Sequence, residues 1–274
     1  MTIITRLVSA EEHRKATGGG PTLAVTKGVK TAAAACFEIT IGGNLMDMLK
    51  IEKQRDYRTS YRTIIKKFSS QGYLRANLHG LYPWGFAMYG SRGLVYGTAY
   101  TSLDKFLSRR TGDVEKRKIL AGVGAGMFEG AATTPFAYMR TMTAQKVMTG
   151  YSGKIDIKTL LRSMPFNAAK RGGDWGIRTA AYNRLTEQID PIPAAFTAGV
   201  VSSVITMPVD RLVPLLQKEN PPPSIVKWVT ESVRKDGFAP IFAGGWARLS
   251  HAGWHTLFIF GALHIMEGNK LLKY

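Results

Sequence analysis

Apolar residues are gathered along this chain into long segments that alternate with short basic stretches. Two of the long segments, residues 192–209 and 249–266, contain no Asp, Glu, Lys or Arg. A helix needs roughly 20 residues to cross the hydrocarbon core of a bilayer, and both segments approach that length. The pattern therefore predicts that both are membrane-spanning helices.

Four further segments are apolar and compatible with helix but are interrupted by one or a few charges: residues 22–53, 73–109, 116–147 and 167–188. Hydropathy alone also permits a soluble all-helical protein. Small residues recur at helical spacing in these segments, as at Gly122, Gly126 and Gly130. Glycine inside a helix costs about 1 kcal/mol relative to alanine in water, but in lipid it allows helices to approach closely. The glycines therefore favour the membrane interpretation.

Short basic amphipathic stretches separate the long segments, at residues 59–73, 154–164 and 223–238. Each is suited to lie in the membrane interface with its Lys and Arg towards the headgroups. The order of long helix, short amphipathic helix and long helix occurs three times, which indicates an internal repeat. We therefore predict an all-α membrane protein with six transmembrane helices, divided into an N-terminal arm (1–21) and three repeats (22–110, 111–190 and 191–274).

The first long helix of each repeat ends in a related motif, at residues 44–54, 134–145 and 207–217. The motif is a proline, an acidic residue two positions later and a basic residue three positions after that, often with a glutamine four further on. Three such units resemble the mitochondrial carrier family, and the resemblance covers nearly the whole chain after residue 22. It implies a six-helix barrel around a central cavity, with helix kinks at Pro135 and Pro208, while the first repeat has Leu45 in place of proline.

The resemblance also implies a ring of ion pairs that closes the matrix side of the barrel. It assigns the ring charges to Asp47, Lys50, Arg140 and Asp210, the lost ring positions to Ala137 and Val213, and the bracing glutamines to Gln54 and Gln217. In the family the acid of each repeat pairs with the base of the next. The expected contacts are therefore Asp47 with Arg140, Asp210 with Lys50, and Ala137 with Val213. Both losses fall in one pair, as expected because a single stranded charge would cost several kcal/mol.

Lipid and substrate positions follow from the same resemblance. Glycines beside the short helices, Gly72, Gly153 and Gly244, correspond to the family's turns that hold cardiolipin phosphates, although an ordinary turn would also explain them. Helix N-termini at such turns suit an anion. The cavity positions fall near Arg92, Arg178 and His251, and charge at that depth normally faces an aqueous cavity.

The net charge of the chain limits the classes of binding partner that are expected. Lys and Arg number 37 against 19 Asp and Glu, a net charge of +18, which favours a phosphate-rich partner. Because the basic residues alternate with apolar segments and form no single stripe, we expect an anionic membrane surface and no nucleic acid. Motifs of common enzyme sites are absent, and five histidines with the single Cys36 give no metal-ligand spacing. We therefore expect neither an enzyme nor a metal site.

Two functions remain open for a multi-pass protein of the mitochondrial inner membrane. The outer gate of the carrier family is hardly recognisable here, and we interpret Asp104, Glu187 and Glu267 as solvated helix ends. Alternating access needs two gates of comparable stability. We therefore expect a structural or accessory subunit of a large inner-membrane complex, respiratory or ATP synthase, with bound cardiolipin. The alternative is an active carrier that exchanges an anionic metabolite other than ADP and ATP, since the run Arg-Arg-Arg-Met-Met-Met is absent.

Overall fold

Helices and turns make up the whole of the chain that the structure describes, and no strand occurs in it. The computed structural model describes residues 32–33, 36–70, 81–149, 156–217, 221–252 and 254. The N-terminal arm (1–21) and most of the predicted helix 249–266 lie outside these residues. The predicted all-α class is confirmed for the described part of the chain.

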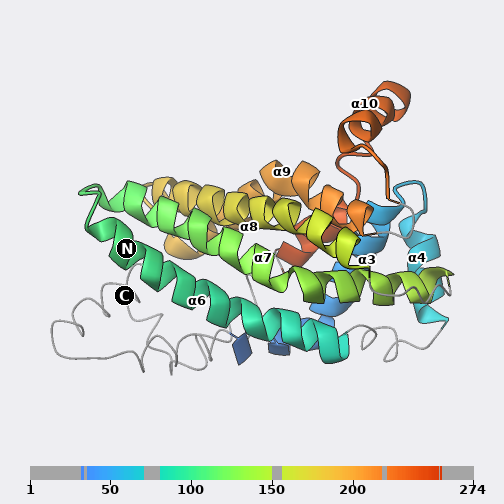
Figure 1. Cartoon of the computed structure of the whole chain (residues 1–274), viewed down its shortest axis with the longest axis horizontal. Helices are drawn as coiled ribbons and strands as arrows, with labels where there is room; N and C mark the ends of the chain where they lie inside the picture. The colour runs from blue at the N-terminus through green and yellow to red at the C-terminus, as the bar shows by residue number, and fades with distance from the viewer. Residues whose placement is uncertain are drawn as a thin grey trace.

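Four long helices lie side by side in sequence order (Figure 1). They are α6 (Phe86–Ser108), α7 (Val114–Thr149), α8 (Ile157–Leu185) and α9 (Pro191–Leu216). Helix α7 packs against both α6 and α8, and α8 packs against α9. Long segments that sequence predicted as separate helices therefore form one antiparallel layer of neighbours.

The shorter elements gather at one end of this layer (Figure 1). A π-helical turn, η1 (Ile39–Gly43), leads into α3 (Asn44–Arg55), which packs against α7 and α9, and α4 (Tyr61–Ser69) follows. A second π-helical turn, η2 (Leu81–Gly85), precedes α6. Helix α10 (Ile225–Asp236) projects from the same end of the bundle and buries none of its side chains. The predicted amphipathic stretches 59–73 and 223–238 thus each contain one short helix.

The third amphipathic stretch, residues 154–164, does not form a helix of its own, contrary to the prediction. It is the first part of α8, which continues through Pro165. The side chain of Asp156 caps this helix by accepting from the amide of Lys158 at 3.1 Å. Arg162 then donates to the carbonyl of Pro222 at 2.6 Å. These contacts hold the first turns in line with the rest of α8, so that tertiary packing outweighs the helix-breaking tendency of the proline.

The two predicted kink prolines also lie inside continuous helices, Pro135 in α7 and Pro208 in α9. In the first repeat, where the motif has Leu45, the π-helical turn of residues 39–43 lies directly before the motif. That α7 and α9 bend more than α3 stays a prediction.

Glycines allow α7 and α8 to approach closely. A Cβ atom on Gly126 would lie 2.6 Å from the carbonyl oxygen of Arg171, and one on Gly130 would lie 2.6 Å from that of Asn167. Asn167 in turn donates from Nδ2 to the carbonyl oxygen of Gly130 at 2.7 Å. The prediction that these glycines serve close helix packing is confirmed for Gly126 and Gly130.

The described part of the chain buries many polar and charged side chains and exposes many large apolar ones. Polar and charged residues are as numerous as apolar ones among the buried positions, while large apolar residues lie on the outer faces. In α7, Phe128 is 67% exposed and the adjacent Glu129 is 1% exposed. Among the described residues, one helix, Pro193–Leu216, is long and apolar enough to cross a membrane. An apolar exterior around a charged interior is typical of proteins in lipid.

Candidate functional site

Helix α3 and the C-terminal parts of α7 and α9 meet at one end of the bundle, and side chains join each helix to the next. We call this region the junction. Its three links are Arg140 to Asp47, Gln54 to Asp210, and Thr141 to Gln217. Each link joins two different repeats of the sequence alignment, and together they form a closed cycle of three helices.

The first link is the ion pair of Asp47 with Arg140, which forms as the alignment predicts. Nη1 of Arg140 lies 2.6 Å from Oδ2 of Asp47, and both side chains are buried. Arg140 also donates from Nη2 to Oδ1 of Asn44 at 2.6 Å. The guanidinium lies 5.5 Å from the ring centroid of Tyr89. This cation is therefore held by a carboxylate, an amide oxygen and an aromatic ring.

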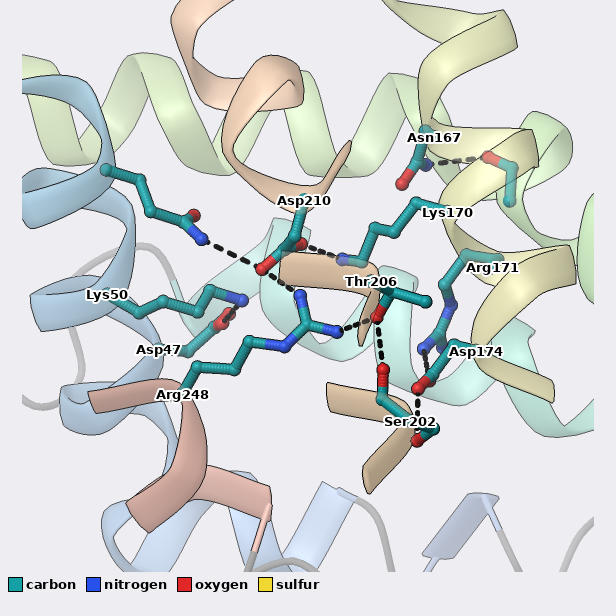
Figure 2. A network of polar contacts seen from close by, with 12 residues as sticks. Asp47, Lys50, Asn167, Lys170, Arg171, Asp174, Ser202, Thr206, Asp210 and Arg248 are labelled. Carbon is teal, nitrogen blue, oxygen red and sulfur yellow. Dashed lines mark hydrogen bonds and ion pairs between the residues drawn. The ribbon is translucent and has the colours of Figure 1, made fainter. Parts of the chain in front are cut away.

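The predicted pair of Asp210 with Lys50 does not form. The ammonium of Lys50 lies 2.7 Å from Oδ1 of Asp47, one turn back on the same helix. Residues at this spacing share one helix face, so Lys50 is satisfied locally. Asp210 instead forms ion pairs with Lys170 of α8 and with Arg248 (Figure 2). The acid of the third repeat is thus paired, but with cations outside the predicted ring.

Both predicted glutamines lie in the junction. Gln54 donates from Nε2 to Oδ2 of Asp210 at 2.9 Å. Gln217 accepts from the hydroxyl of Thr141 at 2.8 Å and donates to Oγ of Ser163 at 3.0 Å. Each glutamine therefore joins its own helix to a different repeat, as the bracing role implies.

The lost ring positions lie one turn before the contact of α7 with α9. Val213 is buried, and Ala137 packs against an apolar cluster that includes Met88 and Tyr89. Helices α7 and α9 meet at Thr141 and Gln217. A direct contact of Ala137 with Val213 stays a prediction.

A second charged group surrounds Glu129 in the middle of the bundle. Nε of Arg171 donates to Oε1 of Glu129 at 2.9 Å, and Nε1 of Trp175 donates to Oε2 at 2.9 Å. Nε of Arg92 lies 3.5 Å from Oε1. One buried carboxylate of α7 therefore joins α6 to α8.

Asp174 of α8 is the centre of a third group. Oδ2 of Asp174 lies 3.2 Å from Nη2 of Arg178 and 3.7 Å from Nη1 of Arg171, and Oδ1 accepts from the hydroxyl of Ser202 at 2.7 Å. Arg171 contacts both Glu129 and Asp174, so it joins the second and third groups.

A chain of hydrogen bonds connects Asp174 to the junction (Figure 2). Arg248, which pairs with Asp210, donates from Nη2 to Oγ1 of Thr206 at 2.6 Å. Thr206 donates to the carbonyl of Ser202 at 2.7 Å, and Ser202 donates to Asp174. Glu129, Asp174 and Asp210, the cations that contact them and Gln54 therefore form one connected polar network that reaches α3, α6, α7, α8 and α9.

Each of the three predicted cavity residues lies against a carboxylate of the chain. Arg92 lies against Glu129, and Arg178 lies against Asp174. Nε2 of His251 lies 3.5 Å from Oε1 of Glu38, which is fully buried. The structure thus places Arg92, Arg178 and His251 at partly buried positions, each beside a carboxylate of the chain, and their role in a substrate cavity stays a prediction.

Sequence reasoning missed most of the partners in this network: Glu129, Lys170, Arg171, Asp174 and Arg248. A usable signal was present in the sequence. Glu129 is a single acid within a glycine-rich apolar helix, and the pair Lys170 and Arg171 precedes two glycines in the next one. Single opposite charges on neighbouring helices that are apolar enough to span a membrane are expected to form ion pairs, because an unpaired charge is unfavourable in lipid.

Of the three predicted lipid positions, Gly72 and Gly153 lie outside the described residues. Gly244 is buried and has φ of +82°, a conformation that favours glycine. A Cβ atom there would lie 2.9 Å from Cγ of Gln54 and 3.2 Å from the carbonyl oxygen of Lys50. Close packing against α3 accounts for this glycine, and its lipid role stays a prediction.

At the opposite end of the bundle, Asp104 of α6 pairs with Arg117 of α7 at 2.8 Å. This pair joins two consecutive helices across their short connection.

Among the described residues, no group of three or more His, Cys, Asp or Glu side chains could hold a metal ion. Comparison of the sequence with family models and with curated proteins finds no match. The resemblance to mitochondrial carriers therefore rests on the residues quoted above.

Proposed function

We propose that the protein is a carrier-fold integral protein of the mitochondrial inner membrane that serves as a structural or accessory subunit of a large respiratory or ATP synthase complex. One observation carries the proposal. The three side chains at the expected substrate positions, Arg92, Arg178 and His251, lie against the chain's own Glu129, Asp174 and Glu38. A substrate anion would have to displace a buried carboxylate at each of them.

The membrane location is supported by the placement of charge. A charged interior with large apolar residues outside is unfavourable in water and favourable in lipid. In this proposal α6, α7, α8 and α9 span the bilayer together with the first and last long segments of the sequence. The buried charges then face each other within the barrel, where they are shielded from hydrocarbon.

The three-repeat barrel is supported by the cyclic links of the junction. The resemblance to the carrier family implies the pair of Asp47 with Arg140, and Nη1 of Arg140 lies 2.6 Å from Oδ2 of Asp47. The same resemblance places Gln54 and Gln217 at equivalent positions, and both join two repeats.

The proposal of a subunit without transport activity is supported by the free energy needed to open the junction. Opening would separate the buried ion pairs of both Asp47 and Asp210, which favours the closed junction. A transport cycle requires inward-open and outward-open states of similar free energy. With a strongly paired junction at one end and, among the described residues, the pair of Asp104 with Arg117 at the other, we expect one state to dominate.

The experiment combines transport and assembly. Purified protein is reconstituted in liposomes that contain cardiolipin, and uptake of labelled phosphate, nucleotides and carboxylates is measured against empty liposomes. In parallel, membranes of the source mitochondria are gently solubilised, and the mass at which the protein migrates on native gels is determined. We expect no saturable uptake and migration with a large complex. Saturable uptake with migration as a single chain would overturn the proposal.

One observation favours the alternative, an active exchanger of an anionic metabolite. Four cations, Lys50, Arg140, Lys170 and Arg248, surround the two carboxylates Asp47 and Asp210. An anion that entered the cavity could share the excess positive charge. The uptake assay decides between the two functions, because only an exchanger would give an uptake rate that saturates as the substrate concentration rises.

A further inference from the structure

Arg211 is a buried cation for which the described residues provide no hydrogen-bond acceptor. It directly follows Asp210 on α9 and is 1% exposed. Its Nε and Nη1 atoms are buried and make no hydrogen bond within the described part of the chain. The ring centroids of Tyr57 and Trp228 lie 5.3 Å and 5.1 Å from its Cζ. The rings stabilise the positive charge, but they provide no acceptor for the guanidinium N–H groups.

The guanidinium lines a cavity of about 360 Å³ between the end of α3, the end of α9 and α10. Arg55, Arg58 and Lys235 contribute further positive charge to its wall. The side chain of Arg58 is 62% exposed, so the cavity is reached from solvent on this side. The cavity is separate from the polar network, since Asp210 faces the junction and Arg211 faces α10.

Two carboxylates of the wall already have donors of their own. Asp56 accepts from the hydroxyl of Thr59 and from the amide of Arg58. Burial raises the pKa of Asp56, but these hydrogen bonds outweigh it and hold the pKa below its ordinary value. Asp236 accepts from the hydroxyl of Tyr57 and from Arg58. Neither carboxylate forms an ion pair with Arg211.

The third carboxylate, Glu231, is 67% exposed and lies 3.8 Å from Lys227 on the outer side of α10. The wall therefore provides donors to the cavity and leaves the N–H groups of Arg211 without an acceptor. A buried polar group in this condition is unfavourable unless a ligand supplies the acceptor.

We propose that this cavity, the Arg211 pocket, binds a phosphate group. A guanidinium offers several N–H donors in a rigid plane that matches phosphate oxygens, and Arg58 and Lys235 add positive charge at the rim. The group belongs either to a soluble phosphate compound or to a phospholipid headgroup, because both present the same oxygens. The proposal does not rest on the function proposed above, since the pocket lies outside the barrel interior.

The test measures stabilisation of the delipidated full-length protein in detergent. The apparent unfolding temperature is recorded with inorganic phosphate, with sodium chloride at equal ionic strength, and with micelles that contain cardiolipin or phosphatidylcholine. We expect a rise with phosphate or with cardiolipin and none with chloride or phosphatidylcholine. A response to phosphate identifies a soluble ligand, and a response to cardiolipin alone identifies a headgroup. No response to either, or an equal response to chloride, would overturn the proposal.

Variants locate the site. Arg211→Met removes the charge and keeps most of the apolar stem, so the unliganded variant should be at least as stable as the wild type. Its affinity for the responding ligand should fall about ten- to hundredfold, the usual worth of a hydrogen bond to a charged group. The control Arg234→Met changes an exposed cation of α10 outside the pocket and should leave the response unchanged.

A second variant covers the case in which Arg211→Met fails to fold. Ser232 lines the pocket, and Ser232→Asp places a carboxylate there. We expect the unliganded variant to be stabilised and its response to the ligand to be lost. If Ser232→Asp or Arg211→Met responds as the wild type does, the pocket does not bind the ligand and the proposal is wrong.

Discussion

The substitution Asp47→Asn should be among the most destabilising changes in the junction. It keeps the shape of the side chain and removes its charge. Arg140 would then retain the 2.6 Å hydrogen bond to Asn44 and lose the 2.6 Å ion pair, while Lys50 would lose its 2.7 Å contact. The change therefore leaves a fully buried guanidinium without a counter-charge.

The expected cost follows from burial. Arg140 has 1% of its side chain exposed and cannot turn to solvent, whereas Lys50, at 13%, can do so in part. Breaking a buried pair in this way costs about 3 to 5 kcal/mol. For a chain of this size, 1 kcal/mol corresponds to about 2 to 4 °C, so the unfolding temperature should fall by about 6 to 20 °C.

The assay is thermal unfolding in a single detergent at a fixed scan rate. Glu231→Gln is the control, because it removes the charge of an exposed carboxylate that lies 3.8 Å from Lys227, and it should cost less than about 0.5 kcal/mol. The double variant Asp47→Leu with Arg140→Met removes both charges and should lose less than Asp47→Asn alone. Equal losses for Asp47→Asn and Glu231→Gln would refute the assignment of this pair as a buried structural contact.

Three further predictions concern packing, pH and assembly. Gly130→Ala should destabilise the protein by about 1 to 3 kcal/mol because its Cβ would lie 2.6 Å from a carbonyl oxygen of α8, whereas Gly97→Ala, with open space around it, should be neutral or stabilising in the same unfolding assay. The hydrogen bond from Tyr57, together with Arg58, holds the pKa of Asp236 below its ordinary value of about 3.9. Tyr57→Phe should therefore lower stability above about pH 4, and its difference from the wild type should vanish as the pH falls through the folded pKa; a constant difference from pH 2 to 6 would contradict this. Deletion of residues 1–20 should release the protein from its host complex on native gels without impairing its folding, and unchanged migration would show that the arm is not the contact.

The parts of the site that sequence predicted correctly are those set by the repeat. The resemblance to the carrier family assigns Asp47 and Arg140 to ring positions of consecutive motifs, and the structure brings these two side chains into contact. The glutamines follow the same rule, since Gln54 and Gln217 are equally spaced from the acids of their repeats. Helix type was predictable for a similar reason, because long apolar segments with small residues at helical spacing are compatible with few other structures. One short helix was predicted wrongly, because contacts of Arg162 outside its own segment hold it in line with the rest of α8.

The partners of Asp210 could not be predicted from the motif. The motif spacing assigns residues to positions, but it does not determine which of several nearby cations pairs with Asp210. Lys50 has two carboxylates within reach of its helix end, and the nearer one, three residues back, requires no contact between helices. Lys170 and Arg248 lie on segments outside the motif, so nothing in the spacing ranks them as partners of Asp210. Their contacts depend on how far α8 and the chain after α10 approach α9, and this distance is set by packing along whole helices, such as the glycine contacts of α7 with α8. The ring expected from three motifs is consequently replaced by a network that extends through five helices. Under the function proposed above, these pairs hold the protein in one state, because a transport cycle would require a second gate of comparable stability.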